Sequence, residues 1–277
     1  MIESSAKLWE DISVLNNLKF EFIYYDYVPI LVARDVFKFP DKVREFFNRG
    51  PWWDTEIVKD DSLIRPGKSY LFHKDIVDWI GYPIAKPLSA LFGLNYMQTN
   101  GINGNCFNGN MRLSDIQSAF PHTDVNDFYP HIAYNINLTQ SDKVCTAFYS
   151  FNNKTKRIDF SLSDKNEEDD FHRNNAKSLS SNSKWFQIKD YGPWKLEQIV
   201  PMGYNSIISY PTTLFHSPYI EEEWFTTSDR ITIAGFLNTS PNDLDFKEEH
   251  LDDISYAWEF FYLDKIHNYH PKKTKPV

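Results

Sequence analysis

The sequence predicts a mainly β protein, built as a barrel or jelly roll with helices outside it. Runs of β-branched and aromatic residues, separated by turn residues, follow one another from residue 95 to residue 240. Helical patterns lie before this region and after it. Aromatic residues make up 17% of the 277 residues, and this bulk suits one large core. We therefore expect a single domain over residues 1–277.

The N-terminal part, residues 1–94, is expected to support the barrel with a strand and helices. Residues 24–37 (YYDYVPILVARDVF) are typical of a strand. Pro40 then opens the helical pattern PDKVREFFNRG, which Gly50 ends. Residues 75–92 (DIVDWIGYPIAKPLSALF) predict one or two further helices with prolines at their starts or kinks.

The core is expected over residues 95–240. Its strand-like runs are NYMQTNGINGN, HIAYNINLT, VCTAFYSF, YNSIISY and RITIAGFLN. The polar segment 152–184, which contains NEEDD and SLSSNS, interrupts them. We expect it to be a solvated loop, the alternative being a lid over a site. Residues 241–277 add a tail and an amphipathic C-terminal helix at 251–267, which would pack on the sheet or on a partner subunit in a homodimer.

Charge and composition exclude several classes of protein. The net charge of -9 argues against binding to nucleic acid or to an anionic membrane surface. The chain does not begin like a signal peptide, and its longest apolar run is too short to span a membrane. Cys106 and Cys145 are too few for a disulfide framework, so we expect buried thiols. We therefore expect a soluble cytoplasmic protein.

Metal binding is suggested by a His-x-Asp pair, because alternate residues of a strand point to the same face. With a third, distant histidine, such a pair can bind non-haem iron(II) and leave coordination positions open. The chain contains three such pairs, which are His73/Asp75, His122/Asp124 and His250/Asp252. The pair alone is therefore a weak signal, and its surroundings must decide.

The surroundings favour His122 and Asp124. The other two pairs precede predicted helices, where an acid in the first turn is an ordinary choice. His122 and Asp124 instead precede the alternating strand HIAYNINLT. Downstream, His216 follows a strand in ISYPTTLFHSPYI, and Arg230 opens the run RITIAGFLN. A loop histidine, a core histidine and a surface ion pair are the structural alternatives for His122, His216 and Arg230.

Five segments resemble the double-stranded β-helix of iron(II)/2-oxoglutarate-dependent oxygenases, a jelly-roll, cupin-like barrel. They are PHTD, HIAYNINLT, TAFY, YNSIISYPTTLFHSP and DRITIAGFLN. The resemblance is greatest to the prolyl-hydroxylase-like branch, and within it to a bacterial group. It extends over most of residues 28–240 and leaves the segment 152–184 and the C-terminal helix unexplained.

The resemblance implies a metal site and a cosubstrate site. The implied iron(II) ligands are His122, Asp124 and His216. Arg230 would pair with the distal carboxylate of 2-oxoglutarate, because its guanidinium is a planar fork of donors. Thr232, on the same strand face, would place a hydroxyl against that carboxylate. Asn135 lies on the polar face of HIAYNINLT and is the expected further cosubstrate contact, where the family often has Tyr.

The implied activity is a dioxygenase reaction in which O2 and 2-oxoglutarate oxidise a substrate, with release of succinate and CO2. Halogenases of the superfamily replace the carboxylate ligand with a small residue, so the presence of Asp124 favours a hydroxylase. The substrate would be a small molecule, an amino acid or a peptide. One alternative is a non-enzymatic β-barrel that binds a ligand or a partner. Another is a cupin-type metal enzyme without 2-oxoglutarate, which would not need an arginine placed like Arg230.

Overall fold

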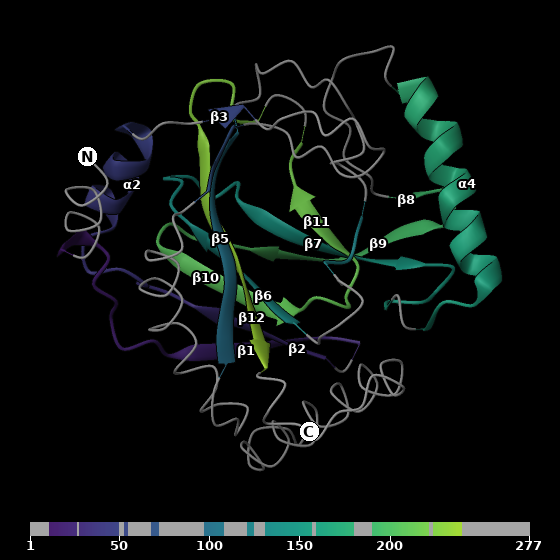
Figure 1. Cartoon of the computed structure of the whole chain (residues 1–277), viewed down its shortest axis with the longest axis horizontal. Helices are drawn as coiled ribbons and strands as arrows, with labels where there is room; N and C mark the ends of the chain where they lie inside the picture. Colours follow the sequence, from purple (N-terminus) through teal and green to yellow (C-terminus); the bar gives the residue numbers. More distant parts are fainter. Residues whose placement is uncertain are drawn as a thin grey trace.

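Two antiparallel β-sheets form the body of the protein (Figure 1). This computed structural model describes residues 11–26, 28–49, 53–54, 68–71, 97–107, 121–124, 131–156, 159–179, 190–221 and 224–239. The larger sheet has the order β1-β2-β10-β6-β12-β5-β4-β3 and the smaller one β11-β7-β9-β8. The predicted mainly β architecture is therefore confirmed. Among the described residues, no helix has the length and apolar character needed to cross a membrane.

The larger sheet has eight described strands and the smaller sheet has four. The larger sheet contains β1 (Phe20–Tyr25), β2 (Val28–Ala33), β3 (Trp53–Asp54), β4 (Lys68–Leu71), β5 (Met97–Phe107), β6 (His131–Asn137), β10 (Ser206–Pro211) and β12 (Arg230–Thr239). The smaller sheet contains β7 (Cys145–Phe151), β8 (Asp190–Tyr191), β9 (Trp194–Pro201) and β11 (His216–Tyr219). Each of the five strand-like runs predicted in the core overlaps one of these strands. The hairpin of β8 and β9 was not predicted.

One face of the larger sheet packs against the smaller sheet, and we call it the inner face. Phe148 of β7 contacts the rings of Tyr25 and Tyr210, with ring centroids 5.5 and 5.2 Å apart. Tyr25 also donates a hydrogen bond of 2.7 Å from its hydroxyl to the carbonyl of Tyr149. Tyr210 pairs with Ala133 of β6. Because side chains alternate along a strand, Asn135 lies on the same inner face.

The opposite, outer face of the smaller sheet carries its own aromatic core. Its buried members are Cys145, Ala147, Tyr149, Phe151, Phe160, Trp194, Phe215 and Tyr219, and Phe171 packs against them. Phe171 belongs to helix α4, which therefore covers this face (Figure 1). Cys145 is a buried free thiol, as predicted. The side chain of Cys106 lies outside the described part of the structure.

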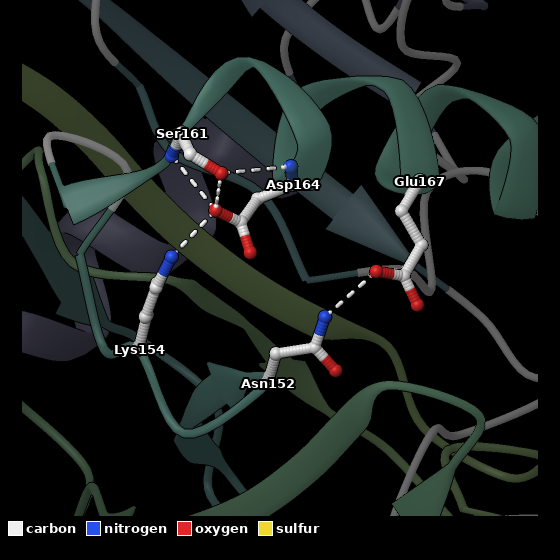
Figure 2. Close-up of polar contacts among 5 residues, drawn as sticks. All are labelled: Asn152, Lys154, Ser161, Asp164 and Glu167. Carbon is white, nitrogen blue, oxygen red and sulfur yellow. Dashed lines mark hydrogen bonds and ion pairs between the residues drawn. The ribbon is translucent and has the colours of Figure 1, made fainter.

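Helix α4 (Leu162–Leu179) occupies most of the polar segment 152–184, so the prediction of a solvated loop was wrong. Ser161 and Asp164 cap its start reciprocally, with the Ser161 N–H donating to Asp164 Oδ2 over 2.7 Å and the Asp164 N–H donating to Ser161 Oγ over 3.3 Å. Lys154 Nζ lies 2.5 Å from Asp164 Oδ2, and Asn152 donates to Glu167 over 2.8 Å (Figure 2). These contacts fix the helix to the chain just after β7.

The N-terminal region was predicted in part. Helix α2 (Pro40–Arg49) begins at the predicted proline. Residues 24–37, predicted as one strand, instead contain the turn between β1 and β2, where Asp26 has a positive φ of 46°. A short polar side chain tolerates that conformation, and a hairpin results. The helices predicted at 75–92 and 251–267 lie outside the described residues.

Candidate metal centre

His122 and His216 lie side by side because their backbones pair. The His122 N–H donates to the His216 carbonyl over 3.0 Å, and the His216 N–H donates to the His122 carbonyl over 2.9 Å. Their imidazole rings are 4.7 Å apart, centroid to centroid. The Asp124 N–H donates to the Thr212 carbonyl over 3.1 Å, which continues the pairing. The backbone thus brings the His-x-Asp pair against the first residue of β11.

The carboxylate of Asp124 lies between the two imidazoles. Its Oδ1 is 3.7 Å from His122 Nε2, and its Oδ2 is 3.1 Å from His216 Nε2. Ligand atoms of the three residues all lie within 4.8 Å of one another. Two imidazoles and one carboxylate converging in this way are the donor set of non-haem iron(II) sites. The structure therefore brings together the three ligands that the sequence predicts.

The imidazole of His216 is oriented by its own turn. Its Nδ1 lies 2.9 Å from the carbonyl of Leu214, which can only accept. In the neutral imidazole, Nδ1–H is therefore the donor and the lone pair is on Nε2, the atom nearest Asp124. His216 is only 4% exposed. The neighbouring Phe215 packs into the outer aromatic core, 5.0 Å from both Phe160 and Trp194 between ring centroids. This anchor holds β11 with His216 on its inner side.

Arg230 begins β12 and carries a buried nitrogen. Its Nε has no hydrogen-bond partner among the described residues. Burial lowers the pKa of Arg230 to about 10, because the low-polarity surroundings disfavour the charged guanidinium. A buried cation of this kind is stabilised by an anion placed against it.

Thr232 and Asn135 lie on the inner face with Arg230. Thr232 is buried and pairs with Asn137 of β6, and Asn135 pairs with Ala234 of β12, so all these side chains share one side of the sheet. Asn135 Nδ2 donates a hydrogen bond of 3.1 Å to the hydroxyl of Tyr210.

Tyr210 contacts both Asn135 and His216, and the sequence analysis did not single it out. Its ring lies 4.7 Å from that of His216, centroid to centroid, and the charge of Arg230 interacts with its hydroxyl. Tyr210 is buried in an apolar strand, where an aromatic residue is ordinarily core. Only the register of β10 against β6 reveals its contact with Asn135, and that register is not readable from the sequence.

Comparisons with known proteins give matches in structure alone, since no family model and no curated protein matches the chain. HygX from Streptomyces hygroscopicus, with nickel and 2-oxoglutarate bound, has a TM-score of 0.45 and 14% identity, covering 78% of this chain and 85% of HygX. EvdO2 from Micromonospora carbonacea var. aurantiaca has a TM-score of 0.46 and 8% identity, covering 85% of this chain and 97% of EvdO2.

A structure of prolyl 4-hydroxylases from Phytophthora capsici has a TM-score of 0.40 and 10% identity, covering 96% of this chain and 74% of the matched one. Another EvdO2 structure is complexed with 2-oxoglutarate.

Proposed function

We propose that this protein is a non-haem iron(II) and 2-oxoglutarate-dependent oxygenase that hydroxylates a small molecule, an amino acid or a peptide. The observation that carries the proposal is the convergence of His122, Asp124 and His216, whose ligand atoms lie within 4.8 Å of one another. The two facing antiparallel sheets support a double-stranded β-helix as the scaffold.

The donor set suits iron(II) on three grounds. Imidazole and carboxylate are ligands that iron(II) accepts, and three protein ligands leave positions open for others. In the neutral imidazole of His216, Nε2 carries the lone pair because Nδ1 donates to the Leu214 carbonyl. One carboxylate oxygen of Asp124 faces His122 and the other faces His216. A cation bound between the three side chains would therefore be held by charge as well as by coordination.

Arg230 supports 2-oxoglutarate as the second ligand. A buried guanidinium nitrogen without a partner among the described residues is suited to a carboxylate, which accepts two parallel hydrogen bonds from this side chain. Thr232, buried on the same face, would add a hydroxyl donor to that carboxylate. These residues would hold the cosubstrate with its keto acid toward the metal.

The residues of the chain would bind and orient the metal, the cosubstrate and the substrate, and the cofactors would supply the oxidation. When bound, iron(II) and 2-oxoglutarate use O2 to hydroxylate the substrate, with release of succinate and CO2. Asp124 would occupy a coordination position that a halide would need, so hydroxylation is favoured over halogenation. Burial of His216 and Tyr210 keeps bulk water from one side of the centre.

The proposal is tested by anaerobic titration of metal-free protein with iron(II) and 2-oxoglutarate, followed by the visible charge-transfer band of the chelate. We expect the band in wild type and its loss in His216→Ala. This variant keeps the backbone hydrogen bonds to His122, so it should fold. His172→Ala is the matched control, because it removes a histidine of α4 that is not one of the three proposed ligands, and it should keep the band.

Two outcomes would overturn the proposal. A charge-transfer band in His216→Ala as strong as that of wild type would contradict the ligand assignment. Absence of both the band and iron(II) binding in folded wild type would favour the alternative, a β-barrel that binds a ligand or partner without redox chemistry.

A further inference from the structure

We propose that the free edge of β1 joins two copies of this chain, which pair as antiparallel strands about a two-fold axis at Phe20. β1 is the end strand of the larger sheet, and among the described residues it pairs with β2 alone (Figure 1). An edge strand presents backbone N–H and C=O groups with which another chain can pair. The inference is independent of the proposed function, because no residue of this edge belongs to the metal centre.

β1 is the longest of the described strands that end the two sheets. β3 and β8 have two residues each, and β11 has four. Very short edge strands are one way in which proteins prevent pairing with other chains. β1 has six residues. Among the described sheet ends, its edge is therefore the one best suited to pair with another chain.

The free edge extends beyond β1 toward the N-terminus. Leu15 pairs with Phe37 in an antiparallel bridge, in the same sense as β1 pairs with β2. Residues 16–19, which connect Leu15 to β1, contain neither a turn nor a bend. The edge therefore runs over residues 15–25, and Phe20 is its middle residue.

Two charged side chains make this edge complementary to itself. Lys19 and Glu21 are exposed, and neither forms a side-chain hydrogen bond or ion pair within the described part of the chain. Because they are two residues apart, they point to the same side of the strand. A two-fold axis at Phe20 places Lys19 opposite Glu21 of the partner subunit, and the symmetry repeats this ion pair. Opposite charges directly across two strands stabilise the pairing, and like charges destabilise it.

The other side of the edge is apolar and is also complementary to itself. Leu18, Phe20 and Phe22 are partly buried and pack against the main hydrophobic core. The same axis places Phe20 opposite Phe20 of the partner subunit, and Leu18 opposite Phe22 of the partner subunit. Pairing would remove from water the apolar surface that these side chains still expose, and cross-strand aromatic pairs add to the stability of a sheet.

Charge reversal in the full chain tests the pairing, and sedimentation velocity at a series of protein concentrations measures it. We expect wild type to dimerise and Lys19→Glu to weaken the dimer by about tenfold or more, because two pairs of like charges then face each other. Adding Glu21→Lys to Lys19→Glu restores both ion pairs in reversed order, so the dissociation constant should return to within about threefold of wild type. Lys165→Glu is the matched control, since Lys165 is exposed on α4 and the net charge changes equally, and it should leave the dissociation constant unchanged.

Cross-linking tests the register of the two strands. A mixture of Lys19→Cys with Glu21→Cys should form a disulfide-linked dimer under mild oxidation, because opposite residues of antiparallel strands have Cα atoms about 4.5–5.5 Å apart. Either variant alone should cross-link much less, since its two cysteines would be two residues out of register and beyond the reach of a disulfide. Wild type under the same oxidation gives the background from its two native cysteines, and circular dichroism checks that each variant is folded.

Three outcomes would overturn the inference. Folded wild type that stays monomeric at the highest concentration would leave this edge to another segment of the chain itself. A dimer with the same dissociation constant in wild type and in Lys19→Glu would place the interface elsewhere. Equal cross-linking in the mixture and in the separate variants would contradict the two-fold axis at Phe20. None of these outcomes bears on the proposed function, which the binding of iron(II) and 2-oxoglutarate tests separately.

Discussion

Asp124 Oδ2 lies 3.1 Å from His216 Nε2, although the two residues come from segments far apart in the chain. The approach is built by the backbone, because the Asp124 N–H donates to Thr212 just before β11 and His122 pairs with His216 itself. Side-chain variants at this centre should therefore alter metal binding and leave the chain pairing in place. Each proposed ligand can therefore be tested by its own variant.

Asp124→Asn should lower the affinity for iron(II) by at least about tenfold, because the amide keeps the size of the carboxylate and removes its charge. The measurement is anaerobic calorimetry, paired with the rise in melting temperature that iron(II) causes in a protein that binds it when folded. Asp142→Asn changes an exposed carboxylate and is the control. An iron(II) affinity equal to that of wild type in Asp124→Asn would remove Asp124 from the ligand set.

The three candidate ligands could be chosen from the sequence because each signal lies in a short segment. His122 and Asp124 are two residues apart, and the strands that follow them alternate with a period of two. The choice among three His-x-Asp pairs needed only the strand before His216 and the position of Arg230. The contact of Asn135 with Tyr210 was not predictable, because it depends on which residue of β10 faces which residue of β6.

The errors in the predicted fold also have local causes. Helix α4 is rich in exposed polar residues and lacks a strong apolar face, so composition alone favoured a loop. The reciprocal capping of Ser161 and Asp164 was nevertheless visible in the sequence as S-x-x-D. The turn between β1 and β2 depends on the positive φ of Asp26, which no pattern of apolar residues reports.

Arg230→Met should weaken 2-oxoglutarate binding by about one to two orders of magnitude, since hydrogen bonds to a charged partner are lost. The same change should leave the unfolding free energy of the ligand-free protein unchanged or raise it. The reason is that a buried guanidinium without a partner at Nε, among the described residues, is costly to fold. Titration with 2-oxoglutarate and denaturant unfolding measure the two effects. An unaltered affinity would show that Arg230 does not bind the cosubstrate.

Asp164 should make the stability depend on pH in the acid range. Hydrogen bonds from Lys154 and Ser161 lower the pKa of Asp164 to about 2, below its ordinary value of 3.8. A lowered pKa in the folded state contributes stability above the unfolded value, and this contribution is lost as the pH falls from about 4 to about 2. Asp164→Asn should therefore be less stable than wild type at pH 6, and the difference should shrink toward pH 2.

Denaturant unfolding at a series of pH values measures this difference. Asp159→Asn is the matched control, because Asp159 is exposed and precedes the same helix. A constant difference between wild type and Asp164→Asn from pH 6 to pH 2 would contradict the assigned network.

Gly235→Ala should destabilise the protein by at least about 1–3 kcal/mol, through overpacking against Tyr134. A Cβ atom at Gly235 would lie 2.3 Å from the Tyr134 hydroxyl and 2.4 Å from its Cζ, and both residues are buried. Gly203→Ala is the control, since a Cβ there meets no atom within 4 Å. Thermal and denaturant unfolding of the two variants should differ clearly, and equal stabilities would show that β12 and β6 do not approach as closely as described.

Tyr134→Phe should raise the unfolding free energy by about 1–2 kcal/mol, because a buried hydroxyl without a hydrogen bond costs free energy that its removal recovers. The Tyr134 hydroxyl is fully buried and has no hydrogen-bond partner among the described residues. Tyr149→Phe removes a hydroxyl that accepts a hydrogen bond of 3.1 Å from Ser217, so it should lower the unfolding free energy instead. Urea unfolding of both variants gives the sign. A loss of stability in Tyr134→Phe would mean that the Tyr134 hydroxyl is hydrogen-bonded in solution. The missing side chain at Gly235 would then only make room for the Tyr134 ring.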